Sequence, residues 1–309
     1  MLVDADDFSA VLVGEKLQSG YGPELSLFPK EADAEPWQMI FAKPQRELLP
    51  LKEEAIRQAQ NLSKQYNNSE LNIFYSGGID SEFLIHIFRE AQVKFRVLTF
   101  RFDGGLNGHD LSYVLNFQKK NPDLKMTMLN FNLLDFFHSG EYMEYALQSR
   151  CVLPHLLSLM KMVYENRAQP SVLGAGEPFL LPHRGEWCLR ERESVAGLNR
   201  FFLKNKIAGT PAFFQESSEL FFSYLGDPIF QQLARGERVG KEHSLTSRID
   251  IYSRHYPISE RTKYHGYEKV EELMLSCEKS LLQNLPHSNT KRYYRYNQLL
   301  KLVQDQHGS

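Results

Sequence analysis

The sequence predicts an α/β fold in which helices cover both faces of a parallel sheet. Between residues 51 and 131, segments with helical spacing of apolar residues alternate with short apolar runs. Clusters of Gly, Asn, Asp and Ser separate these segments, as is typical of the turns between helices and strands. Alternation of this kind is typical of a parallel sheet, which binds ligands beyond the carboxyl ends of its strands.

The elements of this α/β unit follow from residue spacing and turn signals. Apolar residues four apart, such as Leu51, Ala55 and Ala59, predict the first helix. Apolar runs bounded by turn residues predict strands. The predicted helices are 51–66, 81–90, 110–120 and 152–165, and the predicted strands are 71–75, 95–102, 126–131 and 170–173.

Outside this unit the alternation fades. The N-terminal stretch mixes short apolar pieces, such as 10–13, with Gly, Pro and acidic residues, and we expect a decorating segment such as a hairpin. Later in the chain, the predicted helices are 193–206, 217–235, 267–285 and 292–306. The predicted division is an N-terminal segment, 1–50, the α/β unit, 51–180, and a mainly helical lobe, 181–309, that closes over the sheet edge.

The composition excludes several classes of protein. Of the 309 residues, 42% are hydrophobic and 12% aromatic, without a long uncharged apolar run, which excludes a membrane-spanning chain and a disordered chain. Three widely spaced cysteines exclude a disulfide scaffold. With 36 basic and 38 acidic residues, the chain has no overall basic field that would attract nucleic acid. Its first residues carry no basic stretch, so we expect no secretory signal and a cytoplasmic protein.

The sharpest motif is Ser76-Gly77-Gly78-Ile79-Asp80-Ser81, between the first predicted strand and a predicted helix. Glycines permit positive φ and close approach of the backbone, so successive N–H groups can bind an anion at the helix N-terminus. The serine hydroxyls can donate to phosphate oxygens, whereas Asp80 beside a phosphate would need Mg²⁺ or the loop amides as partners. The alternative is a tight turn with an N-cap. Its place between strand and helix favours a nucleotide polyphosphate with a metal.

The segment containing this motif, FYSGGIDSE, resembles the PP-loop signature SGGxDS of the ATP pyrophosphatases. That superfamily includes GMP synthetase, NAD synthetase, asparagine synthetase, the tRNA thiolation enzymes and the deazaguanine synthases. The resemblance covers about residues 71–179 and implies a Rossmann-like (HUP-type) domain that binds ATP and Mg²⁺. It also implies cleavage between the α and β phosphates, transfer of AMP onto a substrate oxygen, and displacement of AMP by a nitrogen or sulfur nucleophile.

The resemblance also implies roles for individual residues. Asp80 and Glu177 are the implied metal ligands, although Pro178 follows Glu177 and the family's acidic pair is reduced to one residue there. The implied nucleotide-binding residues are Ser76, Gly77, Gly78, Asp80 and Ser81 in the loop, the strand end Thr99, Phe100, Arg101 and Phe102 for adenine, and Gly174 with Glu177 in a second glycine-bearing motif.

Adenylation requires positive charge on the leaving pyrophosphate, and the loop contains no lysine. Arg261 and Lys263, in the stretch PISERTKYHG, are the candidates, since members of the superfamily often supply such cations from the C-terminal part. The alternative is that both are solvated surface cations, as most lysines and arginines are. We expect Ser76 and Asp80, with these two cations, to be the catalytic set of the adenylation step.

Cys151 is the candidate for a sulfur reaction, because a cysteine lies at a similar place in tRNA thiolation enzymes. It could carry a persulfide or attack as a thiolate, with Arg150 lowering its pKa. The alternative, a buried structural cysteine, is favoured because Cys188 and Cys277 are far away in the sequence. A zinc site at His183 and Cys188 lacks a further ligand pair.

These observations favour an adenylating enzyme that activates a carbonyl or carboxyl oxygen for a nitrogen nucleophile and forms an amide or amidine. Position 2 is leucine, so nitrogen would come from ammonia, an amine or a separate donor protein. A sulfurtransferase that uses Cys151 and a non-catalytic nucleotide-binding module are the alternatives. The basic and aromatic stretch 291–296 could stack on single-stranded nucleic acid. An amphipathic helix is favoured there, and we expect a small or nucleotide-like substrate, no membrane partner and a possible homodimer.

Overall fold

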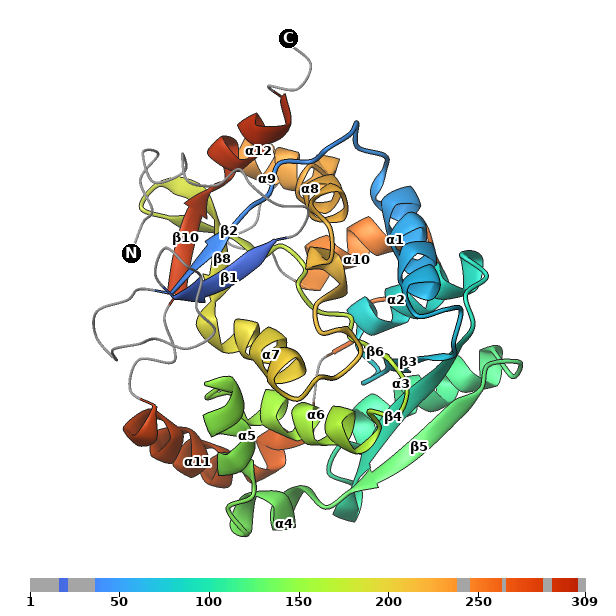
Figure 1. Ribbon diagram of the computed structural model, residues 1–309, viewed down its shortest axis with the longest axis vertical. Helices are drawn as coiled ribbons and strands as arrows, with labels where there is room; N and C mark the ends of the chain where they lie inside the picture. Colours follow the sequence, from blue (N-terminus) through green and yellow to red (C-terminus); the bar gives the residue numbers. More distant parts are fainter. Residues whose placement is uncertain (1–16, 22–36, 238–244, 263–264, 286–290, 305–309) are drawn as a thin grey trace.

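A computed structural model describes residues 17–21, 37–237, 245–262, 265–285 and 291–304 (Figure 1). Within these residues, a five-stranded parallel sheet has the order β5-β4-β3-β6-β9. Its strands are β3 (Leu71–Phe74), β4 (Phe95–Phe102), β5 (Met126–Phe131), β6 (Ser171–Val172) and β9 (Gly209–Thr210). The predicted α/β fold with a parallel sheet is confirmed.

Alternating side chains of the sheet bury two separate cores. Ile73 and Val97 belong to one core, whereas their neighbours Phe74 and Leu98 belong to the other. Side chains of α1 (Leu51–Gln65), α2 (Ile79–Glu90) and α3 (Gly108–Lys120) fill the first core. Those of α4 (Leu133–His138), α5 (Tyr142–Ser149), α6 (Pro154–Glu165), α7 (Glu193–Lys204) and α11 (Glu271–Asn284) fill the second. The sheet is therefore the middle layer of three (Figure 1).

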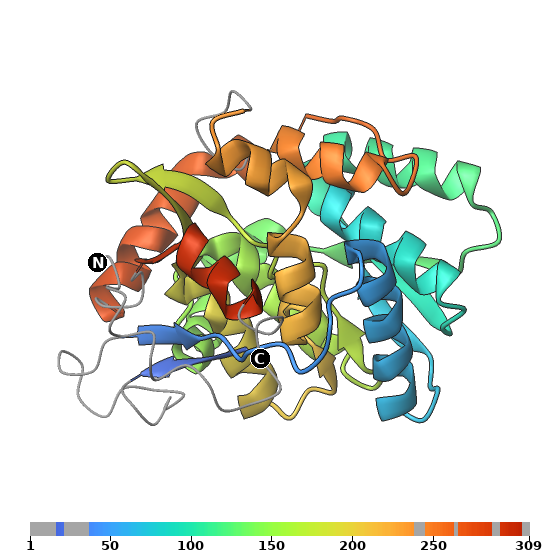
Figure 2. The ribbon, with the colours of Figure 1, turned by 90° about the horizontal axis from the view of Figure 1, so that it is seen from above.

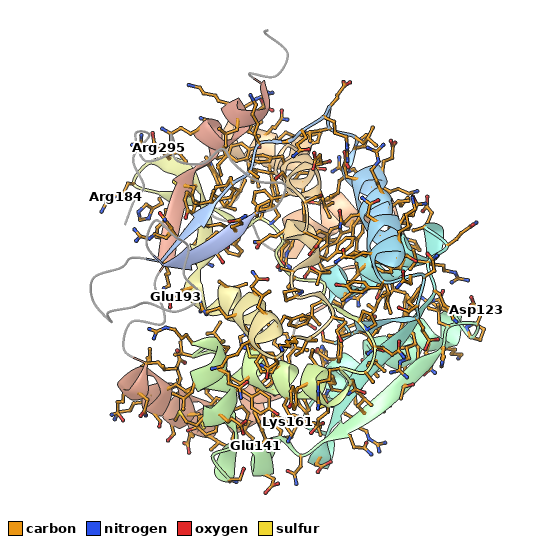
Figure 3. All side chains as sticks on the ribbon, viewed as in Figure 1. Asp123, Glu141, Lys161, Arg184, Glu193 and Arg295 are labelled. Carbon is orange, nitrogen blue, oxygen red and sulfur yellow. The ribbon has the colours of Figure 1, made fainter. Side chains whose placement is uncertain are left out.

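The C-terminal part is less helical than the sequence predicts. Residues 291–295, predicted as the start of a helix, form strand β10 (Lys291–Arg295), which pairs with β8 (Glu186–Arg192). Strand β7 (Leu180–His183) pairs with the other edge of β8. Alternate side chains of β10, Arg292 and Tyr294, are buried, and this period of two explains the strand. Arg184 and Arg295 mark this small sheet in Figure 3, across the molecule from Asp123 between α3 and β5.

Two long predicted helices are interrupted. Residues 217–235 form α8 (Ser218–Leu225) and α9 (Pro228–Ala234), because Asp227 caps α9 and Pro228 begins it. Residues 267–285 form a short 3-10 turn and then α11. Helix α10 (Leu245–Ser253), which the sequence did not indicate, packs beside α2 (Figure 2). The last described helix is α12 (Tyr296–Gln304).

In the N-terminal segment, β1 (Gln18–Tyr21) and β2 (Trp37–Ile40) form an antiparallel pair, as expected for a hairpin. The expected piece 10–13 lies outside the described residues. Since β9 extends the central sheet, residues after 181 also contribute to the α/β unit. The division into three units stays a prediction. In the described part of the chain, we find no helix with the length and apolar character needed to cross a bilayer.

Candidate functional site

The loop between β3 and α2 requires glycine at position 77. Gly77 has φ +86°, and a Cβ added there would lie 2.6 Å from the carbonyl oxygen of Asp110. Any other residue would therefore be strained by its backbone conformation and by contact with α3. Close packing fixes the turn that leads into α2.

The N-terminus of α2 is open to an anion. Gly78 is its N-cap residue and supplies no side chain to accept the first-turn N–H groups. Ser81 donates its hydroxyl to the Gly78 carbonyl at 3.0 Å, and the exposed Ser76 accepts from the Gly78 N–H at 3.4 Å. Ser81 thus fastens the loop, whereas Ser76 lies at the surface beside the helix end.

This helix end lies in a cleft of about 1440 Å³, a volume that includes space open to solvent. One part of the wall is polar and contains Ser76, Asp80 and Glu177. Another part is apolar and contains Phe74, Phe100, Phe102, Leu156 and Leu159. The cleft also brings Gly78, Ser81 and Gly174 together, so most of the residues predicted for nucleotide binding line one cavity. A neighbouring cavity of about 320 Å³ contains Gly77 and Arg261.

At the end of β4, predicted to bind adenine, only two of the four residues line the cleft. Phe100 and Phe102 line the cleft, but Thr99 and Arg101 do not. Thr99 is buried, and Arg101 donates from Nε to Asn130 Oδ1 at 2.9 Å. Alternation along β4 places neighbouring residues on opposite faces, so side chains at all four positions could not share the cleft.

The Asn107 side chain forms hydrogen bonds with two backbone groups at this strand end. Asn107 accepts from the Phe102 N–H through Oδ1 at 2.9 Å and donates to the Phe100 carbonyl through Nδ2 at 2.9 Å. The resemblance assigns this backbone to adenine, so adenine would have to displace Asn107 to use the same two groups. The sequence did not indicate this role of Asn107.

The second glycine-bearing stretch packs against the start of α2. A Cβ added at Gly174 would lie 3.1 Å from the backbone nitrogen of Ser81. Gly176 has φ +87°, and a Cβ there would approach the side chains of Ala212 and Gln215. The absence of a Cβ at Gly174 lets the chain after β6 approach the loop closely. Glu177 comes directly after Gly176 in this stretch.

Arg248 bridges the two carboxylates predicted to hold a metal. Its Nη1 lies 2.5 Å from Asp80 Oδ2 and 3.0 Å from Glu177 Oε1. The other oxygen of Asp80 accepts from the Tyr252 hydroxyl at 2.9 Å. Mg²⁺ prefers several oxygen ligands and retained water, and this pair already neutralises a guanidinium. No cluster of three or more potential metal ligands occurs among the described residues, so Asp80 and Glu177 do not fit an open metal site.

Burial and charge act against each other at this network. Burial lowers the pKa of Arg248, but the charges of Asp80 and Glu177 outweigh it and raise the pKa above its usual value. Burial raises the pKa of Tyr252, and the nearby Asp80 charge raises it further. Arg248 therefore stays charged and Tyr252 stays a neutral hydroxyl donor. Nothing in the local sequence indicated either residue, since both lie on α10, far from the loop in the chain.

Arg261 connects the loop to α2. Its Nη1 donates to the Gly77 carbonyl at 2.6 Å, and its Nη2 lies 2.9 Å from Glu82 Oε2. Tyr75 donates its hydroxyl to the same Glu82 oxygen at 2.6 Å. Arg261 is predicted to be a cation for the phosphates, but its described contacts are with the loop, with α2 and with the Tyr113 ring of α3. Lys263 lies outside the described residues.

Cys151 lies apart from the cleft. Its side chain is fully buried in the second core, and burial raises the pKa of the thiol to about 12. Arg150, expected to activate the thiol, lies with its Nε 3.8 Å from Glu193 Oε1. These contacts favour the alternative of a structural cysteine, and the role of Cys151 as a nucleophile stays a prediction. The other two cysteines are also buried, and His183 stacks on Tyr293 with ring centroids 3.9 Å apart.

The mouth of the cleft contains further polar groups that the sequence did not indicate as a site. His265 Nδ1 lies 3.3 Å from Asp110 Oδ2, and both residues line the cleft. His155 and Tyr267 also line it and continue into a groove of about 970 Å³ beside α11. Space for a second ligand therefore adjoins the cleft.

The fold and these contacts define an α/β protein with a glycine-bearing loop at the carboxyl end of a central parallel strand, beside a helix N-terminus that no described side chain caps. No family model matches the sequence, and no curated protein matches it. Solved structures similar to this chain include an NMN synthetase from Francisella tularensis, with 11% identity, a TM-score of 0.33, and 69% of this chain and 97% of that chain covered. Another is a U34-tRNA thiolase from Methanococcus maripaludis, with 11% identity, a TM-score of 0.32, and 81% of this chain and 80% of that chain covered. We therefore infer the function from the residues of the site.

Proposed function

We propose that this chain is an ATP-dependent adenylating enzyme whose phosphate-binding element is the loop 76–81. The observation that carries the proposal is the uncapped N-terminus of α2, entered through Gly77 and open to a large cleft. Aligned N–H groups and the helix dipole bind phosphate well at such a place. The exposed Ser76 hydroxyl adds a further donor.

The cleft suits a whole nucleotide. Its polar part at the loop would take the triphosphate, and its apolar part at Phe74, Phe100 and Phe102 would take the adenosine. The groove next to it, at His155 and Tyr267, would take the acceptor, a small or nucleotide-like molecule. This arrangement would bring an acceptor oxygen towards the α-phosphate.

The reaction then has two displacements. A carbonyl or carboxyl oxygen of the acceptor attacks the α-phosphorus, an O–P bond forms, and pyrophosphate leaves with the electrons of the broken bond. An amine or ammonia then attacks the activated carbon, AMP leaves with its oxygen, and the nitrogen loses a proton to solvent. The loop supports the first step by holding the phosphate oxygens with fixed donors, which need no reorganisation as charge develops.

Nitrogen attack is preferred to sulfur attack because of Cys151. A nucleophilic cysteine needs thiolate character and access, and this thiol has a raised pKa and no exposed surface. A separate protein could supply the nitrogen, and cytoplasmic ATP would supply the nucleotide.

Calorimetric titration with α,β-methylene ATP, which cannot be cleaved at the relevant bond, tests the binding site. We expect the wild-type protein to bind it and Ser76→Ala to weaken binding by about tenfold, since one charge-assisted donor is lost. Ser139→Ala, at an exposed position between α4 and α5, is the matched control and should bind like the wild type. Equal affinity in all three proteins would show that the loop is not the phosphate site.

Pyrophosphate release tests the reaction. We expect ATP with a pool of small metabolites to give pyrophosphate and AMP with the wild type, and neither product with Asp80→Ala. Binding of the analogue with no pyrophosphate from any pool would favour the non-catalytic module.

A further inference from the structure

The carboxylates of Asp80 and Glu177 converge on one nitrogen. Arg248 Nη1 contacts an oxygen of each, at 2.5 Å and 3.0 Å. The three side chains come from α2, from the stretch after β6 and from α10, so the fold brings them together from distant parts of the chain. The guanidinium lies where the sequence predicts a divalent metal ion.

Arg248 is held in this place by its helix. Tyr252, one turn later on α10, stacks on Phe83 of α2 with ring centroids 4.3 Å apart and planes 17° apart. Its hydroxyl donates to Asp80 and accepts from the Tyr224 hydroxyl at 2.7 Å. Ile251 of the same helix is fully buried. An anchored helix presents Arg248 in a fixed position, as expected for a permanent part of the site.

The Arg248 guanidinium offsets one of the two negative charges of Asp80 and Glu177, and it is covalently tethered and cannot exchange with solvent. Arg248 is mostly buried, with 11% of its side chain exposed, and its Nε has no hydrogen-bond partner within the described residues. A metal ion between the same oxygens would lie within a few ångströms of this guanidinium. Repulsion between a divalent ion and a fixed positive charge about 4 Å away weakens binding by more than about tenfold even at the dielectric constant of water.

We infer that the Arg248 guanidinium is the resident cation of the Asp80–Glu177 pair and closes the pair to divalent metal ions. The inference deepens the proposed function, on which its meaning for phosphate chemistry rests. Arg248 then acts as a positioning residue that holds Asp80 and Glu177 at the edge of the loop and offsets their charge where an anionic nucleotide binds.

Titration of the nucleotide-free, full-length protein with Mn²⁺, followed by the electron paramagnetic resonance signal of the free ion, tests the inference. We expect no tight site in the wild type. Arg248→Met should bind one Mn²⁺ at least about tenfold more tightly than the wild type, because the repulsion is removed. Arg248→Lys keeps the charge and should bind Mn²⁺ as weakly as the wild type does. The added substitution Glu177→Gln should abolish the site gained by Arg248→Met.

Two results would overturn the inference. One is a tight Mn²⁺ site in the wild type that Glu177→Gln removes, a result that needs no variant at position 248. The other is a folded Arg248→Met, judged by circular dichroism, that gains no Mn²⁺. Because no nucleotide is present, both are separate from the proposed function, which the ATP-analogue titration tests.

Discussion

At the scale of single residues, Gly77 has an unusual backbone conformation and Glu191 has an unusual environment. Gly77 has positive φ and no room for a side chain, and Glu191 is a carboxyl group in the interior. A substitution at each of these residues can be compared with the same substitution at a glycine or glutamate elsewhere in the chain.

Gly77→Ala should destabilise the protein and weaken binding of the ATP analogue. The substitution adds backbone strain at φ +86° and a Cβ 2.6 Å from the Asp110 carbonyl. Gly140 has φ +82° with no atom within 4 Å of an added Cβ, so Gly140→Ala adds strain alone. In urea denaturation we expect a loss of about 1–2 kcal/mol for Gly140→Ala and at least about 3 kcal/mol for Gly77→Ala. Similar losses in both would show that contact with α3 does not constrain the loop.

Glu191→Gln should change how stability depends on pH. The pKa of Glu191 is raised from 4.5 to about 8, first by burial and then by the charge of Glu177, while a hydrogen bond from Gln215 acts in the opposite direction. The folded protein therefore keeps a proton that the unfolded chain loses, so this group's contribution falls as the pH rises from 4.5 to about 8.

The measurement is the free energy of unfolding in urea across that pH range. We expect the wild type to lose stability relative to Glu191→Gln by up to about 1.4 kcal/mol per pH unit. Glu47→Gln, at an exposed position, should follow the wild type. Parallel curves for the wild type and Glu191→Gln would show that Glu191 titrates normally.

At the scale of elements, α2 and its loop depend on a buried ion pair supplied by a distant segment. The side chains of Arg261 and Glu82 are each only 7% exposed, and Arg261 also holds the Gly77 carbonyl. Removing one partner leaves the other charge buried. Arg261 thus connects the stability of α2 with the shape of the loop.

Arg261→Ala should therefore cost about 3–5 kcal/mol in urea denaturation and weaken binding of the ATP analogue. Adding Glu82→Gln should recover part of the stability, because the unpaired carboxylate is removed. It should not recover analogue binding, since the Gly77 carbonyl still lacks its donor. Additive losses in the double variant would show that the pair is not coupled.

The sequence predicts the elements that rest on long, uniform patterns. Strands β3, β4 and β5 match their predicted ranges closely because they are apolar runs between turn residues. The two-residue strand β6 lies within the predicted strand 170–173, whereas the two-residue strand β9 forms mainly through tertiary pairing, which local pattern cannot show.

The same distinction applies to the site. The loop 76–81 is a contiguous motif, and the sequence locates it. Arg248 and Tyr252 reach Asp80 from 168 and 172 positions later in the chain, where nothing in the local sequence marks them. Asn107 is a similar case, since an asparagine in a turn has many local uses.

At the scale of the whole molecule, all three cysteines are inside. Cys151 and Cys188 have no exposed surface and Cys277 is 4% exposed. Burial raises the pKa of each thiol. Such thiols react only when the fold opens.

We therefore expect the native protein to react with a chromogenic disulfide reagent far more slowly than the unfolded chain, in which all three thiols react. Cys151→Ser should leave AMP release with ammonia as the nitrogen donor intact if the reaction uses nitrogen. Fast modification of Cys151 in the native protein, or loss of AMP release in a folded Cys151→Ser, would instead favour the sulfur reaction.

The distance in the chain between the loop and its supports has a consequence for biosynthesis. Gly77 and Asp80 are made early, but the arginines that hold them are 184 and 168 positions further on. A nascent chain that ends before α10 lacks both arginines, and so lacks the groups that hold the Gly77 carbonyl and pair with Asp80. If the loop binds nucleotide as proposed, this activity should begin only after Arg261 has been synthesised, and products terminated before α10 should be inert towards ATP.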